Sequence, residues 1–387
     1  MLNVALPKGR LGEKVYDMFE KRGAYCHRAR NAWVKAKKAE GEAAPVRYSA
    51  DDLYKALPEF DPSKSIATRA ANNTVMNALA KVACNLIGGS ADLEPSNKTG
   101  LKESGWISAD DFSGRNIHFG IRELAMSAIV NGITAYGGYR AFGATFFVFS
   151  DYMKPAIRMS ALMRLKVIYV WSHDSFRVGE DGPTHQPIEQ EMQIRLMEQV
   201  HNHRGERSMV VLRPADAEET VVAWQYAMSE QRPVALIFSR QNVKSIPPMG
   251  SSRKQESQQA MKGAYIVMDS AKAQVVMLAS GSEVSPLTDG AELLQKDGIP
   301  VRVVSVPSEG LFRDQPKSYQ ESVLPKDIIR YGMTSGLSIN LRGLVGENGT
   351  IHGCDHFGYS APFKVLDEKF GYNGQTVYEE VKAMIKG

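Results

Sequence analysis

Short apolar runs rich in β-branched residues recur along this chain, and they restrict its fold more than any other feature. The clearest five are Val167–Ser172, Met209–Arg213, Val234–Ser239, Ala273–Ala279 and Val301–Val306. Such nearly continuous runs are typical of strands that are buried on both faces of a parallel sheet. Stretches with helical periodicity lie among them, at residues 75–86, 121–136, 218–228 and 283–295. The alternation predicts an α/β protein with mainly parallel sheets.

A polar segment containing Gly and Pro divides this pattern in two. It runs from Ser245 to Gln259 and predicts a linker. Beyond it, two shorter candidate strands at 328–331 and 350–352 and a closing helix at 378–385 extend the second half. We therefore predict a helical arm or linker at 1–62, an α/β domain at 63–245, a linker at 246–262 and a second α/β domain at 263–387.

The first sixty residues differ in character from the rest. Ten Lys or Arg residues lie between Lys8 and Lys38, interleaved with apolar side chains. This pattern predicts one or two basic amphipathic helices within residues 12–40. Since a charged helical face is usually solvated, we expect an arm packed on the main body.

The overall composition is that of an ordinary soluble protein. A net charge of +4 over 387 residues does not indicate nucleic-acid binding, although it suits a basic pocket for phosphorylated substrates. The three cysteines, Cys26, Cys84 and Cys354, form neither a disulfide framework nor a zinc spacing and indicate a reducing compartment. No apolar run approaches the ~20 residues of a membrane span, and no signal-peptide core is present. We expect a cytoplasmic protein with no nucleic-acid or membrane partner.

The densest group of chemically active residues is the segment His173–Pro187. It follows a strand expected to end at Ser172, so it should lie at the carboxyl edge of the sheet, where open α/β sheets bind ligands. Two histidines, three carboxylates and an arginine make it too polar for a core. His173 and His185 are too far apart in sequence to form a helical pair of metal ligands. From its residues alone, the segment is either a solvated turn or a functional loop.

Two further segments have a structural and a functional interpretation each. Gly88–Asn97 combines glycines with Ser90, Ser96 and Asn97, which suits either a tight turn or the binding of a phosphate or sugar. Glu123 stands early in an apolar helix, where a carboxylate either stabilises the helix N-terminus or, when buried, transfers protons. The capping interpretation is the simpler one.

A third segment carries aromatic residues at i, i+3 and i+6, namely Phe146, Phe149 and Tyr152. Aromatic side chains at this spacing usually belong to a core. They are equally able to wall a flat heteroaromatic ring.

In this order and at these separations, the four segments resemble transketolase. The most specific run is Gly179-Glu-Asp-Gly-Pro-Thr-His-Gln-Pro, which distinguishes transketolase from deoxyxylulose-phosphate synthase and the β subunits of 2-oxoacid dehydrogenases. The resemblance extends from about Ala67 to Lys386 and includes Gly281-Ser-Glu-Val and Phe357-Gly-Tyr-Ser-Ala-Pro. It implies that the first domain is the pyrimidine-binding domain of the thiamine-diphosphate fold. The second is then the transketolase C-terminal domain, which is generally structural and aids dimer contacts.

The resemblance implies catalytic roles for three residues. Glu123 would contact the ring nitrogen of the aminopyrimidine of thiamine diphosphate and favour the imino tautomer, which removes the thiazolium proton. His185 would assist proton transfer at the substrate carbonyl. His173 would hold a substrate hydroxyl, together with Asp181. The implied reaction moves a two-carbon ketol unit from a ketose phosphate to an aldose phosphate, as in the pentose phosphate pathway.

The other implied roles are binding roles. Phe146, Phe149 and Tyr152 would line the pyrimidine pocket, and Asp92 would sit near the cofactor. The residues that resemble sugar-phosphate anchors are Arg69, Ser96 and Arg240. Arginine suits this task because a guanidinium binds phosphate oxygens in pairs.

Three features depart from the family pattern. Leu124 stands where many members have His, and Arg177 replaces a common Gly, so both departures lie beside functional positions. The first residues, Asn3–Lys14, resemble the start of an ATP phosphoribosyltransferase instead. The phosphate-cradling loop that such an enzyme needs is not found. We interpret this stretch as a fusion, a misassigned start or a coincidence.

Half of the implied site has no counterpart in this sequence. Transketolases bind magnesium and the diphosphate through an N-terminal domain with a Gly-Asp-Gly motif, and neither Glu180-Asp-Gly nor Lys296-Asp-Gly begins one. We therefore assign no metal ligand here and expect magnesium on the missing domain. The expected partners are sugar phosphates, with a homodimer, a separate diphosphate-binding subunit, or both. The alternative is a non-catalytic dimerising or binding module from a truncated or fused transketolase gene.

Overall fold

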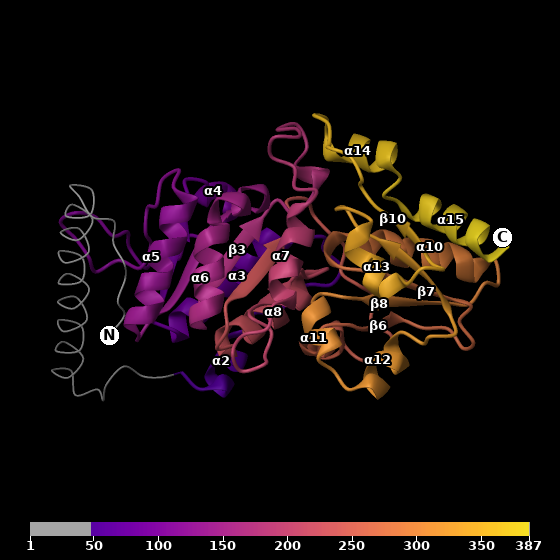
Figure 1. Ribbon diagram of the computed structural model, residues 1–387, viewed down its shortest axis with the longest axis horizontal. Helices are drawn as coiled ribbons and strands as arrows, with labels where there is room; N and C mark the ends of the chain where they lie inside the picture. Colours follow the sequence, from indigo (N-terminus) through magenta and orange to yellow (C-terminus); the bar gives the residue numbers. More distant parts are fainter. Residues whose placement is uncertain (1–47, 387) are drawn as a thin grey trace.

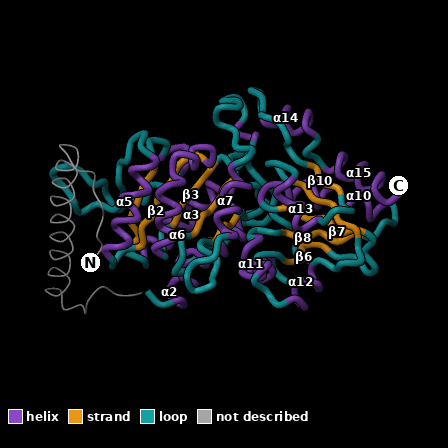
Figure 2. Tube along the Cα trace, in the orientation of Figure 1, coloured by secondary structure: helices purple, strands orange, loops and turns teal. Residues whose placement is uncertain are grey.

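Two five-stranded sheets lie side by side along the long axis of the molecule, each enclosed by helices (Figure 1; Figure 2). The computed structural model describes residues 48–386. The basic helices expected within residues 12–40 lie outside the described residues. The α/β fold class with mainly parallel sheets is confirmed.

The first sheet is parallel throughout, with the strand order β1-β2-β3-β5-β4. Its strands are β1 Leu86–Ser90, β2 Arg140–Phe146, β3 Ile168–Ser172, β4 Val210–Leu212 and β5 Val234–Phe238. Helices α3 Thr68–Val82 and α8 Ala217–Ser229 cover one face, and α5 Glu123–Tyr136, α6 Lys154–Met163 and α7 Gln190–Gln199 cover the other. Side chains of β3 alternate between the two cores, with Ile168 and Val170 on one side and Tyr169 and Trp171 on the other.

Shorter helices surround this sheet. They are α2 Ala50–Ala56, α4 Glu94–Asn97, and the 3₁₀ helices η1 Phe147–Met153 and η2 Phe176–Val178. The segment predicted as a linker contains α9 Arg253–Ser257 and the 3₁₀ helix η3 Gln258–Lys262. Arg253 is buried there and forms ion pairs with Asp216 and Glu219, so this connection is fixed to the first domain.

The second sheet has the order β10-β9-β7-β8-β6, with β6 antiparallel to β8 and the other pairs parallel. Its strands are β6 Tyr265–Met268, β7 Val275–Ala279, β8 Val301–Ser305, β9 Ile329–Met333 and β10 Thr350–His352. Helices α10 Val284–Lys296 and α15 Gly374–Lys386 pack on one face; α11 Glu309–Arg313, α12 Lys317–Val323 and α13 Ile339–Val345 pack on the other. The 3₁₀ helix η4 Gly281–Glu283 precedes α10, and α14 Phe363–Phe370 precedes α15.

The two domains share a hydrophobic core at their junction. Phe176, Ile188 and Val222 of the first domain belong to the same buried cluster as Met277 and Leu287 of the second. The shared cluster fixes how the domains sit relative to each other. No helix of the described part of the chain is long and apolar enough to cross a membrane.

The predicted strands at 167–172, 209–213, 234–239, 273–279, 301–306, 328–331 and 350–352 are all confirmed within one or two residues at either end. The helix predicted at 75–86 was placed too late: α3 begins at Thr68, and Leu86 already starts β1. The apolar pattern missed the first turns because a polar residue, Asn72, occupies the core face of α3, where it accepts a hydrogen bond from Trp224 of α8 (2.8 Å).

Candidate active site at the carboxyl edge of the first sheet

The candidate residues gather where the parallel strands of the first sheet end. Asp92 follows β1, Phe146 ends β2, His173 follows β3 and Arg240 follows β5. Helix α5 leads directly into β2, so its first residue, Glu123, lies at the same edge. The strand order therefore assembles side chains that are far apart in sequence at the edge where open α/β sheets bind ligands.

The aromatic residues form a row rather than a part of the core. The ring centroids of Phe146 and Phe149 are 6.1 Å apart and those of Phe149 and Tyr152 are 6.2 Å apart, with interplanar angles of 6° and 29°. Residues 147–153 form a 3₁₀ helix, in which side chains at i and i+3 lie above one another. Phe146 is buried but Tyr152 is 62% exposed. The core interpretation is thus wrong for Tyr152, and the row presents a flat apolar wall of the kind that packs against an aromatic ring.

His173 is buried at the inner end of this row. Its ring stacks on Phe146 with the centroids 3.6 Å apart, and its backbone has a φ of 62°, which a non-glycine residue rarely adopts. Its Nδ1 lies 2.7 Å from the Ser172 hydroxyl and its Nε2 lies 3.4 Å from Nη1 of Arg69. Such a conformation persists only where the surroundings hold it firmly.

A buried relay fixes the tautomer of His173. Asn97 donates to Ser90 Oγ (2.6 Å) and its Oδ1 accepts from Ser172 Oγ (2.5 Å). Because the only proton of the Ser172 hydroxyl goes to Asn97, its oxygen must accept from Nδ1–H of His173. Nε2 is then the acceptor nitrogen of the ring, and Nη1 of Arg69 donates to it at 3.4 Å. The sequence interpretation of Ser90 and Asn97 as phosphate or sugar ligands did not foresee this supporting role, nor did it single out Ser172.

We expect His173 to stay neutral between about pH 5 and 8, with its proton on Nδ1. Burial disfavours the imidazolium, and Arg69, Arg240 and His185 disfavour it further, so the pKa of His173 falls to about 2. Because the unfolded chain takes up this proton and the folded chain does not, His173 makes the fold less stable as the pH drops below the ordinary histidine range.

Nitrogen–proton correlation NMR of the histidine-labelled chain measures both properties. Ser172→Ala removes the acceptor of the Nδ1 proton and is expected to weaken the preference for this tautomer. An imidazolium signal from His173 within this pH range would contradict the assignment.

Two arginines face the same space without a carboxylate partner. Among the described residues, neither Arg69 nor Arg240 forms an ion pair with Asp or Glu. Nη1 of Arg69 donates to the Ser96 carbonyl (2.6 Å), while its buried Nε finds no partner in this part of the chain. Burial and the nearby Arg240 lower the pKa of Arg69. Two partly buried cations that repel each other favour an anion between them.

The rest of the 173–187 loop places its polar groups at different depths. His185 meets the edges of Phe149 and Phe146 at centroid distances of 5.4 and 6.3 Å, and its Nδ1 lies 2.8 Å from the Thr184 hydroxyl. His173 and His185 thus lie on the same aromatic row. Asp181 is exposed, and the structure does not bring it into contact with them.

Glu123 and Asp92 lie at the outer part of this region. Glu123 is the first residue of α5, with 9% of its surface exposed, and the preceding Arg122 makes no side-chain cap. Leu124, beside it, is half exposed. Asp92 is exposed and has a φ of 64°, a turn conformation that Asp tolerates. Glu123 suits the helix N-terminus and the proton-transfer role alike.

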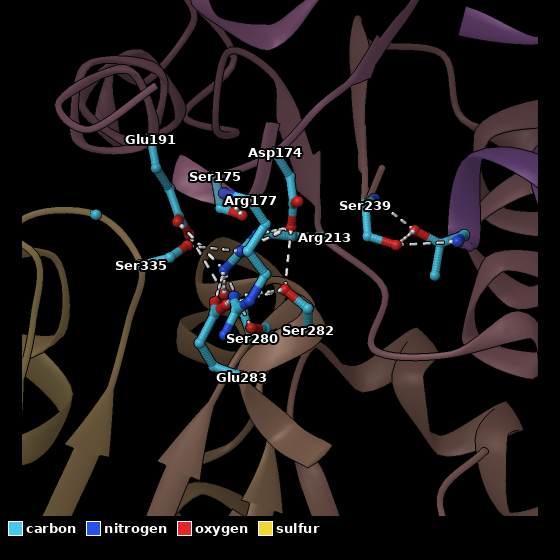
Figure 3. Close-up of polar contacts among 12 residues, drawn as sticks. Asp174, Ser175, Arg177, Glu191, Arg213, Ser239, Ser280, Ser282, Glu283 and Ser335 are labelled. Carbon is cyan, nitrogen blue, oxygen red and sulfur yellow. Dashed lines mark hydrogen bonds and ion pairs between the residues drawn. The ribbon is translucent and has the colours of Figure 1, made fainter. Parts of the chain in front are cut away.

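The residue that departs most from the expected pattern, Arg177, is buried in a cluster of charges between the domains. Figure 3 shows Arg177 and Arg213 between Asp174 of the first domain and Glu283 of the second. Arg213 is wholly buried and also donates to the Ser280 carbonyl and the Ser335 hydroxyl. No local sequence pattern indicates this cluster, because its members lie far apart along the chain.

The arrangement fits one end of a thiamine cofactor but not the other. The aromatic row and the acidic Glu123 provide a flat apolar wall and a carboxylate, which is the chemistry that a protonatable heteroaromatic ring requires. Within residues 48–386, however, no group of three or more His, Cys, Asp or Glu residues is placed to hold a metal ion. A diphosphate, which is usually bound through a metal, finds no such site in the described part of the chain.

Family models match both domains. The model described as transketolase, pyrimidine binding domain, matches residues 64–245, and the transketolase-like C-terminal domain matches residues 263–373. A transketolase from Halalkalibacterium halodurans is 45% identical over 332 residues, which are 85% of this chain and 48% of that protein. The chain spans about half the length of the curated relatives it matches.

Solved structures show the same relation. The crystal structure of transketolase from Campylobacter jejuni is 37% identical, with a TM-score of 0.76, and the match covers 96% of this chain and 52% of that one. A structure described as a split gene transketolase, an inactive β4 tetramer, matches with a TM-score of 0.63 over 84% of this chain and 99% of that chain. At 22% identity the latter likeness shows a common fold only.

Proposed function

Because this chain belongs to the transketolase family, we propose that it supplies the pyrimidine-binding and sugar-phosphate-binding half of a thiamine-diphosphate-dependent ketol transferase. The reaction is the transfer of a two-carbon ketol unit from a ketose phosphate to an aldose phosphate. The domain that binds magnesium and the diphosphate would come from another polypeptide. The site residues expected from the sequence keep their proposed roles.

The observation that carries this proposal is the pair of arginines beside a neutral histidine. Arg69 and Arg240 offer two guanidinium groups without a carboxylate partner in the described residues, which suits a phosphate. His173, next to them, would accept a hydrogen bond from a sugar hydroxyl at Nε2, in place of its long contact with Nη1 of Arg69 (3.4 Å). Ser96 would be a third phosphate anchor, and its backbone carbonyl also holds Arg69. Asp181 would hold a substrate hydroxyl, and His185 would assist proton transfer at the substrate carbonyl.

The aromatic row would hold the cofactor's pyrimidine. Phe146 and Phe149 would flank the ring, with Tyr152 at the open end and Asp92 nearby. When bound, thiamine diphosphate supplies a carbon nucleophile and an electron sink for cleavage of the ketose. Glu123 would hold and share a proton at the pyrimidine ring nitrogen, and His185 would move a proton at the substrate carbonyl.

A partner subunit completes the proposal. Among the described residues, no group of three or more His, Cys, Asp or Glu is placed to hold a metal ion, and the chain spans about half of its relatives. Leu124 of α5 and Met159 and Leu162 of α6 expose apolar side chains on two helices that contact each other. We propose that this surface meets a second copy, a diphosphate-binding subunit, or both. The split transketolase of similar fold offers a precedent for divided genes. We place the reaction in the cytoplasm, which agrees with Cys84 and Cys354 being free thiols.

Reconstitution tests the proposal directly. The purified chain is mixed with a separately expressed diphosphate-binding domain of a relative, thiamine diphosphate and magnesium, and ketol transfer between sugar phosphates is measured. We expect transfer only when both polypeptides are present, and weak cofactor binding to this chain alone. Tight binding of the cofactor to the isolated chain would refute the proposal that another polypeptide supplies the diphosphate-binding domain. Inactivity with every partner would favour the alternative, a non-catalytic dimerising or binding module.

Arg240→Met is expected to raise the KM for a phosphorylated ketose by about 10–100-fold, the loss of one charge-assisted hydrogen-bond pair. The KM for a non-phosphorylated ketol donor should change little, because the variant removes only the phosphate contact. Steady-state kinetics of the reconstituted enzyme with both donors gives the two values. An equal rise in KM for both donors would show that Arg240 does not bind the phosphate.

A further inference from the structure

The second domain binds the 173–187 loop through ion pairs with Arg177. Nε of Arg177 lies 2.6 Å from Oδ1 of Asp367, and Nη1 lies 2.6 Å from Oε1 of Glu283. The arginine side chain is only 4% exposed, and its guanidinium carbon lies 5.2 Å from the centre of the Tyr372 ring. All three partners belong to the second domain. A loop arginine held by two carboxylates of another domain is a strong, directional link.

The same carboxylate also reaches the start of the loop. Glu283 binds Arg213, and Arg213 donates from Nη2 to Oδ2 of Asp174 (2.8 Å). Asp174 directly follows His173, so Glu283 is connected to the loop at two points, Asp174 and Arg177 (Figure 3). Both connections are buried, and water screens them little.

A third connection lies farther along the loop. Gln186 donates from Nε2 to the carbonyls of Gly179 (3.1 Å) and Tyr359 (3.0 Å), and the Ser360 hydroxyl donates to the carbonyl of Glu180. Tyr359 and Ser360 belong to the second domain. The loop is therefore tied to that domain at its start, middle and end.

The loop needs such support because its backbone is unusual. His173, Gly179 and Gly182 have φ values of 62°, 88° and 75°. A non-glycine residue with positive φ costs of order 1–3 kcal/mol and persists only when its surroundings hold it. The first domain alone does not account for the conformation, since both carboxylate partners of Arg177 lie in the second domain and Asp174 also accepts from the Ser282 hydroxyl there (3.5 Å).

We propose that Arg177, with Glu283 and Asp367, is a positioning element through which the C-terminal domain fixes the 173–187 loop for sugar-phosphate binding. This gives the second domain a part in substrate recognition in addition to its structural one. The proposal rests on the proposed function of the loop. Arg177 itself touches no substrate in this scheme and acts through His173 and the backbone that follows it.

The first test is amide hydrogen exchange of the full chain, which does not depend on activity. Arg177→Met keeps the aliphatic stem but removes both ion pairs, and it is expected to speed exchange of peptides covering 173–187 by about tenfold or more. The matched control is Arg207→Met. Arg207 also links the domains, through Asp314 (2.9 Å) and the Gly310 carbonyl (3.1 Å), but it precedes β4 and so lies at the opposite edge of the sheet.

The control variant is expected to change exchange near residues 310–314 and not in the loop. Unchanged loop exchange in Arg177→Met, or an equal increase in Arg207→Met, would overturn the proposal. Asp367→Asn is a milder second variant, since Asp367 is partly exposed and the amide keeps its shape. If Arg177→Met fails to fold, Asp367→Asn takes its place, and it should also speed amide exchange in the loop.

The second test is kinetic and uses the reconstituted enzyme. Arg177→Met should raise the KM for the phosphorylated ketose about tenfold, because small misplacements of a binding group are costly. The kcat should stay within about twofold, since no reacting group is removed. Arg177→Lys should raise this KM less than Arg177→Met does, because lysine keeps the positive charge. A fall in kcat with an unchanged KM would contradict a positioning role. If the unmodified chain is inactive with every partner, the proposed function fails, while hydrogen exchange still decides whether Arg177 holds the loop.

Discussion

Glu123→Gln is expected to reduce ketol transfer by the reconstituted enzyme by about 10²–10⁴-fold, the range for losing a positioned proton-transfer group. Glutamine has the same size and keeps an acceptor oxygen, but it cannot hold or share the proton at the pyrimidine ring. Glu123 begins α5 at the carboxyl edge of the sheet and has 9% of its surface exposed, so little water competes for it. The measurement is kcat at saturating cofactor, magnesium and substrates.

The matched control for this prediction is Glu94→Gln. Glu94 also begins a helix, α4, and its Oε1 accepts a hydrogen bond from the Gly100 amide (2.7 Å), which glutamine can still accept. This variant should keep nearly full activity. If Glu123→Gln is as active as the control, the carboxylate only stabilises the helix N-terminus, and the capping interpretation is correct.

Arg213→Met is expected to lower the free energy of unfolding by about 3–5 kcal/mol, the usual cost of removing one partner of a buried ion pair. Arg213 is fully buried and lies between Asp174 and Glu283, one from each domain. Without it, Asp174 keeps no other cation within ion-pair distance among the described residues. Urea unfolding at neutral pH, followed by tryptophan fluorescence, measures the change.

Lys244→Met provides the comparison for this loss of stability. Lys244 pairs with Asp289 at 2.8 Å, but both side chains are well exposed, with 64% and 43% of their surfaces accessible. Such a surface pair contributes at most about 1 kcal/mol. Similar losses in the two variants would show that water reaches the Arg213 cluster and that its charges are largely screened.

The main strands and their common edge could be predicted from sequence because buried parallel strands consist of nearly continuous apolar residues. The sequence did not predict β1, because its Gly88 and Gly89 indicate a turn. The structure explains them: a Cβ on Gly88 would lie 2.1 Å from the carbonyl oxygen of Phe142, and one on Gly89 would lie 2.0 Å from that of Ile117. β2 was also missed, because it begins with Arg140, whose buried guanidinium donates to the carbonyls of Ala227 and Glu230.

The residues of the candidate site could be selected from sequence, but their mutual geometry could not. The spacing of Phe146, Phe149 and Tyr152 fits a helical core as well as a 3₁₀ row, and only the structure distinguishes them. Arg177 appeared as a departure from a family pattern. Its partners Glu283 and Asp367 are 106 and 190 residues away in sequence, and no local pattern connects residues so distant.

The three-residue period of η1 makes the number of residues in this segment as important as their identity. Successive residues of a 3₁₀ helix are turned by about 120°, so inserting or deleting one residue between Phe146 and Tyr152 would point the later rings away from the row. Exchange of Phe149 for another aromatic residue keeps the row intact. Natural variation here should therefore replace residues but preserve the two-residue interval between rings, which makes length conservation in η1 a marker for relatives that keep the same wall.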